Sequence, residues 1–181
     1  MNKILTFIAT LLVVLTLWFQ RHIFFDSYDA TYMHEFYSMS QWALPLSSRV
    51  MGDASLYVYS GYELLNTAFK PFNINPETPI FAKLFFGISA TLTNNPHNAS
   101  VLFLLLLLVG INQIAKQHFS FSKNKRILLV ILVFCSAEIQ EQVVYTLLDL
   151  PQVTLFVWHI FFLFKFKELQ NRTHKNALYG G

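Results

Sequence analysis

Charged residues are scarce in this 181-residue chain: only 13% of its residues are Asp, Glu, Lys or Arg, whereas 54% are hydrophobic. A typical soluble domain has about 25% charged residues, so this composition favours a membrane protein. Cysteine is almost absent as well. The single Cys135 has no partner within the chain, which excludes an internal disulfide framework. We expect it to pack as a small apolar side chain.

Signatures of catalysis and of cofactor binding are also missing. The sequence contains no glycine-rich phosphate loop, no HExxH, no Cys-x-x-Cys and no Gly-x-Ser-x-Gly. We therefore predict no catalytic residues, no metal site and no cofactor. Four ligand-type side chains do occur close together but lack regular metal-ligand spacing, and a solvated junction is the favoured interpretation; they are Asp26, Asp29, His34 and Glu35.

What the chain has instead is long apolar runs. Their lengths predict an all-α membrane protein with four transmembrane helices, because about 20 apolar residues cross a bilayer. The predicted spans cover about residues 1–20, 98–115, 127–148 and 151–165. The first run resembles a signal peptide, but no small-x-small cleavage site follows it, so we interpret it as an uncleaved anchor.

Between the first two predicted spans lies a mixed segment, residues 21–97, which we expect to form a small helical periplasmic module. Its last part, about residues 79–93, is apolar but too short to cross a bilayer. We predict an interfacial helix there, with Lys83 extending its ammonium group to the lipid head groups.

The distribution of basic residues predicts the orientation. Nine of the 13 Lys and Arg residues lie at the start of the chain, in the basic loop KQHFSFSKNKR or in the tail after residue 164, whereas segment 21–97 holds four. Cytoplasmic segments carry the excess of Lys and Arg. We therefore expect a multi-pass protein of the bacterial inner membrane with both termini cytoplasmic, with the lipid bilayer as its environment.

The most informative stretch is the predicted third span, because it carries carboxylates. On a straight helix Glu138 would lie roughly 16 Å from either end, near the bilayer midplane. An ionised side chain there costs at least ~3 kcal/mol, so this polar face must meet other helices, a wet cavity or a partner. Helical spacing places five polar residues on that face: Glu138, Glu141, Gln142, Tyr145 and Asp149.

The last two predicted spans form a hairpin centred near Leu150, which places Glu141 and His159 at the same depth. At this depth the two side chains can meet, and an imidazole beside a carboxylate would lower the cost of burying either. The pair is interpreted as a hydrogen-bonded clamp or partner-binding face, with a proton- or ion-handling site as the alternative.

The last third of the chain carries a family resemblance. The stretch KNKRILLVILVF leads into YTLLDLPQV, and a final apolar run ends in the basic FKFKEL. The order of a basic segment before the third run, a turn between the last two runs and a basic segment after the last run resembles that of small four-span inner-membrane proteins encoded on integrating conjugative elements. The resemblance implies an accessory membrane component of DNA-transfer machinery, without known catalytic residues.

These observations predict a non-catalytic inner-membrane protein that binds a membrane-protein partner. The resemblance implies that the protein is an accessory or assembly component of conjugative DNA-transfer machinery. No direct binding of nucleic acid is expected. Two alternatives stay open. An immunity protein against a pore-forming bacteriocin has the same size and topology. A small proton- or ion-linked membrane enzyme or transporter would use Glu138 and Glu141.

Overall fold

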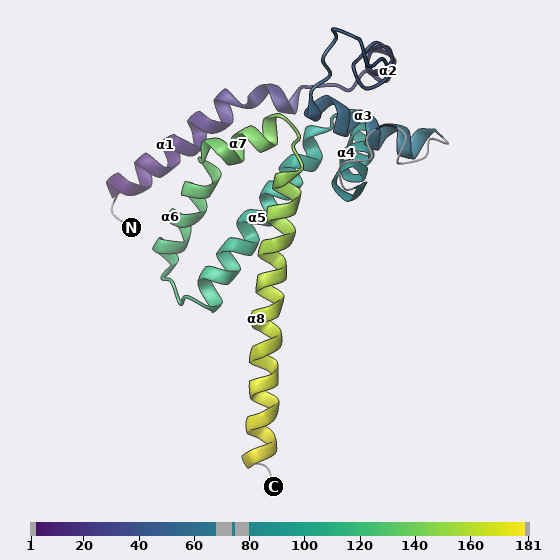
Figure 1. Ribbon diagram of the computed structural model, residues 1–181. Helices are drawn as coiled ribbons and strands as arrows, with labels where there is room; N and C mark the ends of the chain where they lie inside the picture. The colour runs from purple at the N-terminus through teal and green to yellow at the C-terminus, as the bar shows by residue number, and fades with distance from the viewer. Residues whose placement is uncertain (1–2, 68–73, 75–79, 180–181) are drawn as a thin grey trace.

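The chain folds into an assembly of helices. The structure is a computed structural model, which describes residues 3–67, 74 and 80–179. Within these residues no strand occurs beyond one isolated bridge between Ser40 and Arg49. The all-α prediction is therefore confirmed. In chain order the elements are α1 (Lys3–Phe19), the 3-10 helix η1 (Arg21–Phe24), α2 (Ala30–Ser38), α3 (Asp53–Asn66), α4 (Ile80–Thr93), α5 (His97–Gln117), α6 (Lys123–Phe134), α7 (Ala137–Val144) and α8 (Asp149–Tyr179) (Figure 1).

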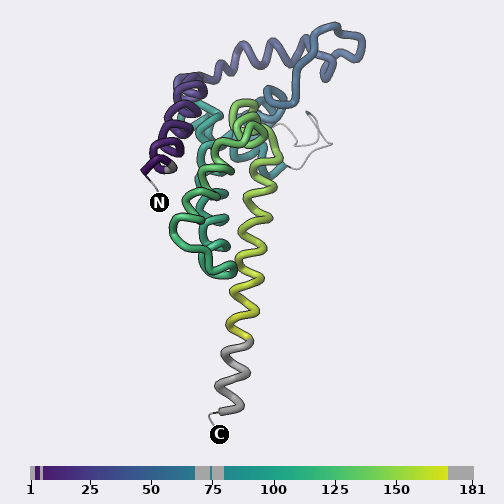
Figure 2. The backbone as a smooth tube through the Cα atoms, turned by 90° about the vertical axis from the view of Figure 1, so that its left-hand side faces the viewer, coloured from purple at the N-terminus to yellow at the C-terminus, as the bar shows by residue number. Residues whose placement is uncertain are grey.

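Helices α5, α6 and α8 run side by side, and α8 extends beyond the other two (Figures 1 and 2). The side of α5 that carries Phe103, Leu104 and Leu107 is buried against Leu150 and Val143. The Thr154 hydroxyl, buried between α5 and α8, lies 3.1 Å from the Phe103 carbonyl oxygen and 2.7 Å from that of Leu150. This apolar packing with satisfied polar groups fixes α8 along α5.

Helix α1 is apolar on all sides and packs on one narrow line. Its inward residues Ala9, Val13 and Thr16 follow helical spacing, while most other large side chains on the helix are exposed. The Thr16 hydroxyl lies 3.6 Å from the Cys135 sulfur at the end of α6. A helix that is hydrophobic all round and exposed in the isolated chain is typical of a segment in contact with lipid.

The predicted third span is not one helix, so the continuous helix expected over 127–148 is wrong. It consists of α6 and α7, which are bent by 53° at Cys135 and Ser136. The Ser136 side chain accepts a hydrogen bond from the Ile139 N–H and so begins a new helix. The Gln140 amide donates to the Phe134 carbonyl, which the break leaves without its helical partner.

Helices α3 and α4 cross in direct backbone contact at Gly61 and Gly87. A methyl group at Gly61 would overlap the Lys83 carbonyl, and one at Gly87 would overlap the Gly61 carbonyl. Glycine permits such an approach because it has no Cβ. Together with α2, these two helices form a helical module beside one end of the long helices (Figure 1).

The expectation for Lys83 is wrong: its side chain does not extend to the surface. Lys83 is only 1% exposed, and its ammonium nitrogen lies 5.8 Å from the centre of the Tyr57 ring of α3. Burial lowers the pKa of the Lys83 ammonium group. The inner face of α4 packs on α3, and this contact covers the lysine.

One helix, α5, is both long and apolar enough to cross a bilayer by itself. Helices α6 and α7 meet the same criterion only as a bent pair, and α1 and α4 are shorter apolar helices. The structure is therefore compatible with a membrane protein with one or two such segments among the described residues.

The close crossing of α3 and α4 predicts a strong effect of Gly61→Ala. The added methyl group must push the two backbones apart, and we expect it to lower the free energy of unfolding by about 3 kcal/mol, the upper end of overpacking costs. Unfolding of the full chain in detergent measures this. Gly52→Ala is the control, because nothing lies within 4 Å of a methyl group there, and its effect should stay within about 1 kcal/mol. Equal effects would contradict the crossing.

Candidate functional site

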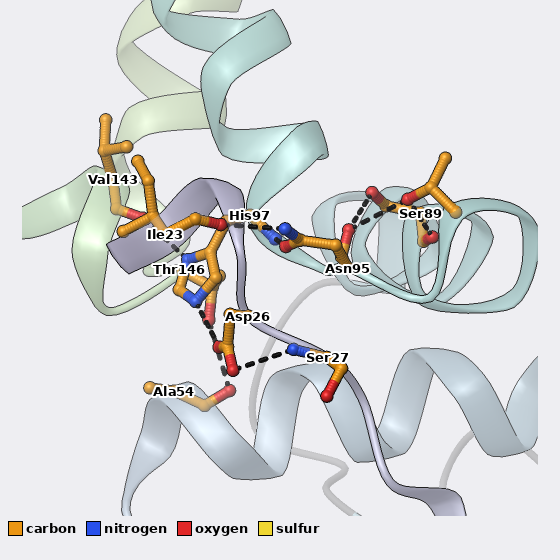
Figure 3. A network of polar contacts seen from close by, with 10 residues as sticks. Ile23, Asp26, Ser27, Ala54, Ser89, Asn95, His97, Val143 and Thr146 are labelled. Carbon is orange, nitrogen blue, oxygen red and sulfur yellow. Dashed lines mark hydrogen bonds and ion pairs between the residues drawn. The ribbon is translucent and has the colours of Figure 1, made fainter. Parts of the chain in front are cut away.

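A polar junction lies where the module of α2, α3 and α4 meets the long helices, and Asn95 is its centre (Figure 3). Asn95 is buried in the turn between α4 and α5. Its side-chain nitrogen donates to the Ile23 carbonyl at 2.7 Å, and its side-chain oxygen accepts from the His97 N–H at 2.9 Å. The Ser89 hydroxyl donates to the Asn95 backbone carbonyl at 2.7 Å. One residue thus holds η1, α4 and α5 together.

His97, the first residue of α5, continues the junction in two directions. Its Nδ1 lies 3.2 Å from the Val143 carbonyl oxygen at the end of α7, and its Nε2 lies 2.9 Å from the Asp26 carboxylate. The residue is only 9% exposed. One imidazole ring therefore links His97 to Val143 and to Asp26, which lie 46 and 71 residues away in the sequence.

The hydrogen-bonding capacity of the groups around His97 sets how many protons its two contacts require. The Val143 carbonyl and an ionised Asp26 are both acceptors only, whereas a neutral imidazole has a single N–H. Both hydrogen bonds therefore need two protons, which are either both on His97 or divided between His97 and Asp26. In each case the pair has a net charge of zero, which lowers the cost of holding His97 in the protein interior.

A cavity of about 340 Å³ opens beside the pair. The Asp26 side chain is 52% exposed, and its second oxygen accepts from the Ser27 N–H at 2.9 Å. The walls come from the start of α3, the start of α5, the segment that leads into α2 and the turn after α7. Polar and aromatic side chains predominate among the residues that line it; they include Asp26, Tyr28, Asp29, Tyr32, Ser55, His97, Tyr145 and Thr146.

The cavity combines carboxylates with tyrosine rings. The Tyr28 hydroxyl is buried without a hydrogen-bond partner, and burial, with Glu63 nearby, raises its pKa. The exposed groups of the cavity, the Asp26 carboxylate and the Tyr145 ring, suit a cationic or hydrogen-bonding group of a partner. Among the described residues no three metal-ligating side chains gather. Asp29 accepts from the Tyr32 N–H as the cap of α2, and His34 bonds the Tyr59 hydroxyl. Three of the four ligand-type side chains near residues 26–35, Asp26, Asp29 and His34, therefore make separate contacts.

The polar residues predicted on the third span lie mostly at the surface. Glu138 is exposed and accepts from the Ser136 hydroxyl at 2.8 Å, and Glu141 is exposed as well. Tyr145 is 54% exposed and lines the cavity. The half-buried Gln142 donates to Asp149, the first residue of α8, at 3.3 Å.

The structure shows where Glu138 lies along the helix bundle, whereas its depth in a bilayer stays a prediction. Val143 contacts His97, which begins α5 at the end of the bundle nearest the outer module. Glu138 precedes Val143 by five residues, about 7.5 Å of helix. Since α7 is inclined by 53° to α6, part of this distance is perpendicular to the axis of α6. Glu138 and Glu141 thus lie near the end of the helix bundle and away from its middle.

The predicted contact between Glu141 and His159 is not formed. Both side chains are exposed, and no hydrogen bond or ion pair of the described residues joins them. The prediction assumed two straight helices on either side of Leu150, but α7 is inclined and ends at Val144. Equal sequence distance from the corner therefore does not give equal depth.

Sequence reasoning missed the junction residues Asn95 and His97. The signal was present: the run NNPHN interrupts two apolar segments with four polar side chains around one proline. Such a run must pair its own polar groups when it is buried. What the sequence does not indicate is the set of partners, because Ile23, Asp26 and Val143 are distant along the chain.

Comparison of the chain with protein-family models, curated proteins and solved structures gives no match.

The junction predicts unequal effects for two asparagines. Asn95→Ala leaves the buried Ile23 carbonyl and His97 N–H without partners, and we expect a loss of about 2–3 kcal/mol in the free energy of unfolding. Asn98→Ala is the matched control on the exposed side of α5, where the side chain bonds only Thr93, and should change it by less than about 0.5 kcal/mol. Chemical unfolding of the full chain in detergent measures both; similar losses would contradict the central role of Asn95.

Proposed function

We propose that this chain is a bacterial inner-membrane protein with four spans, formed by α1, α5, the broken pair α6–α7 and α8. The helices α2, α3 and α4 then form the periplasmic module, and the start of α1 and the end of α8 lie on the cytoplasmic side. Two observations support this arrangement. Helix α5 meets the length and hydropathy requirement alone, and the basic residues concentrate at the opposite end from the module.

We further propose that its role is the non-catalytic binding of another membrane protein at the periplasmic end. The observation that carries this proposal is the exposed polar face of α7, on which Glu138 and Glu141 lie without a buried partner. Tyr145 continues this face into the cavity beside Asp26. By contrast, the buried Asn95, His97 and Thr154 use their hydrogen bonds within the chain.

The chemistry of this face suggests the partner. Its exposed ionisable groups are carboxylates, and near the bilayer surface each gains from an opposite charge. Tyrosine is enriched among the residues that contribute most to protein–protein binding. A partner that presents Lys or Arg beside apolar side chains fits both features. The resemblance to proteins of conjugative elements makes DNA-transfer components the first candidates.

The alternative of a proton- or ion-linked enzyme or transporter would use Glu138 and Glu141, with Glu141 and His159 as a proton- or ion-handling pair. These residues do not meet, and Glu138 and Glu141 are exposed near one end of the bundle. Such a relay therefore has no geometric support among the described residues. Binding to a partner remains the function that the positions of these side chains favour.

The proposed topology has a direct test. A reporter that is active only in the periplasm should work when fused after Ser48, which is exposed between α2 and α3, and fail when fused after Asn124 at the start of α6. A reporter active only in the cytoplasm should give the reverse result. Periplasmic activity after Asn124 would contradict the four-span arrangement, because α5 would then not cross from outside to inside.

The proposed binding face can be tested by photocrosslinking in cells. The photoreactive residue p-benzoylphenylalanine at Glu141 or at Tyr145 should give one adduct of the same mass, with a membrane protein other than this chain. Glu138→Lys should abolish the Tyr145 adduct by charge repulsion. Glu35→Lys, a matched change on the exposed side of α2, should leave it unchanged.

Three outcomes would contradict the proposal. The first is the absence of an adduct at both positions. The second is the same adduct from Phe156, an exposed residue of α8 that serves as the position control. The third is an adduct with the mass of two copies of this chain, which would indicate self-association.

A further inference from the structure

A second cavity lies at the opposite end of the bundle, between α5 and α6. Its volume is about 240 Å³, and every side chain that lines it is apolar. Three of these side chains come from the last turns of α5, two from the connecting loop and one from α6; they are Ile111, Ile114, Ala115, Phe119, Phe121 and Leu129. Such a cavity favours an aliphatic chain over any polar group.

The loop between the helices shapes this cavity. Ser120 adopts a left-handed conformation with φ 50°, which reverses the chain after α5. The Phe121 N–H then donates to the Ala115 carbonyl at 3.0 Å, so the loop is held against the last turn of α5. As a result, the rings of Phe119 and Phe121 lie 5.7 Å apart beside the opening. Both remain partly exposed although they are fully apolar.

The loop beside this opening is rich in cations. Lys116, Lys123, Lys125 and Arg126 lie within eleven residues of one another, and no Asp or Glu occurs between residues 98 and 137. The Lys125 ammonium nitrogen lies 6.0 Å from the centre of the Phe121 ring, which brings a cation to the rim of the cavity. The Ser122 side chain makes no capping hydrogen bond to α6, so the first N–H groups of this helix add to the positive potential.

We propose that this cavity binds an anionic phospholipid, with part of an acyl chain between α5 and α6 and the phosphate against Lys123 and Lys125. The proposal rests on the membrane location proposed above, which brings this end to the inner leaflet. Charge complementarity identifies the occupant. An apolar cavity alone accepts any lipid chain, but a cation at its rim, in a loop with four cations and no Asp or Glu, favours an anionic head group. The exposed phenylalanines extend the apolar surface toward the bilayer.

The test compares phosphatidylglycerol with phosphatidylcholine of identical acyl chains. The full chain, purified in detergent, is titrated with each lipid, and native mass spectrometry measures the bound fraction. We expect about tenfold tighter binding of phosphatidylglycerol. In the variant Lys123→Gln/Lys125→Gln, where both side chains are exposed, the preference should fall below threefold. Ala115→Leu, which fills the cavity from a buried position, should weaken binding of both lipids.

A charge-matched control separates a site from general attraction. Lys3→Gln/Arg49→Gln removes two exposed cations outside this loop, one at the start of α1 and one between α2 and α3, and should leave the preference unchanged. Equal binding of the two lipids by the unmodified chain would overturn the proposal, as would an equal loss of preference in the control variant. If Ala115→Leu fails to fold, the charge variants still decide. Lipid preference without a crosslinked partner would reject only the proposed function, whereas an adduct without lipid preference would reject only this inference.

Discussion

At the end of an apolar helix bundle, buried backbone N–H and C=O groups must find hydrogen-bond partners while the apolar core stays away from water. The rest of the structure follows from how this chain meets that requirement. Asn95 and His97 meet this requirement for three parts of the chain at once, through Ile23, Asp26 and Val143. An unpaired group at such a buried point costs about 1–3 kcal/mol, a large part of the stability of a chain this size.

The position of the junction determines where the other features lie. Because His97 holds the end of α7, the turn after α7 forms one wall of the cavity and Tyr145 faces it. The break at Ser136 then turns Glu138 and Glu141 outward near the same end. The chain therefore presents two chemically different ends, one with carboxylates and tyrosines, the other with cations around an apolar cavity. This separation is what supports a protein partner at one end and an anionic lipid at the other.

Apolar length was sufficient to predict several helices from sequence. The runs at 1–20, 79–93 and 98–115 match α1, α4 and α5 closely. The length of an apolar run did not predict the helix boundaries where a local polar contact competes with a continuous helix. Ser136 begins a new helix within an apolar run, and helical spacing alone cannot show that its hydroxyl takes the cap position. Lys83 was misplaced for a related reason, since only the close crossing at Gly61 explains how α3 covers it. The junction itself is non-local, so no spacing rule indicates it.

The contact between His97 and Asp26 holds the module to the helix bundle. A double-mutant cycle with Asp26→Ala and His97→Ala tests it most directly, through the free energy of unfolding of the full chain in detergent. Because Asp26 is half exposed, we expect a coupling energy of about 1 kcal/mol, so the double variant should lose less stability than the sum of the single losses. Additivity within about 0.3 kcal/mol would show that the two side chains are energetically independent and would contradict this account.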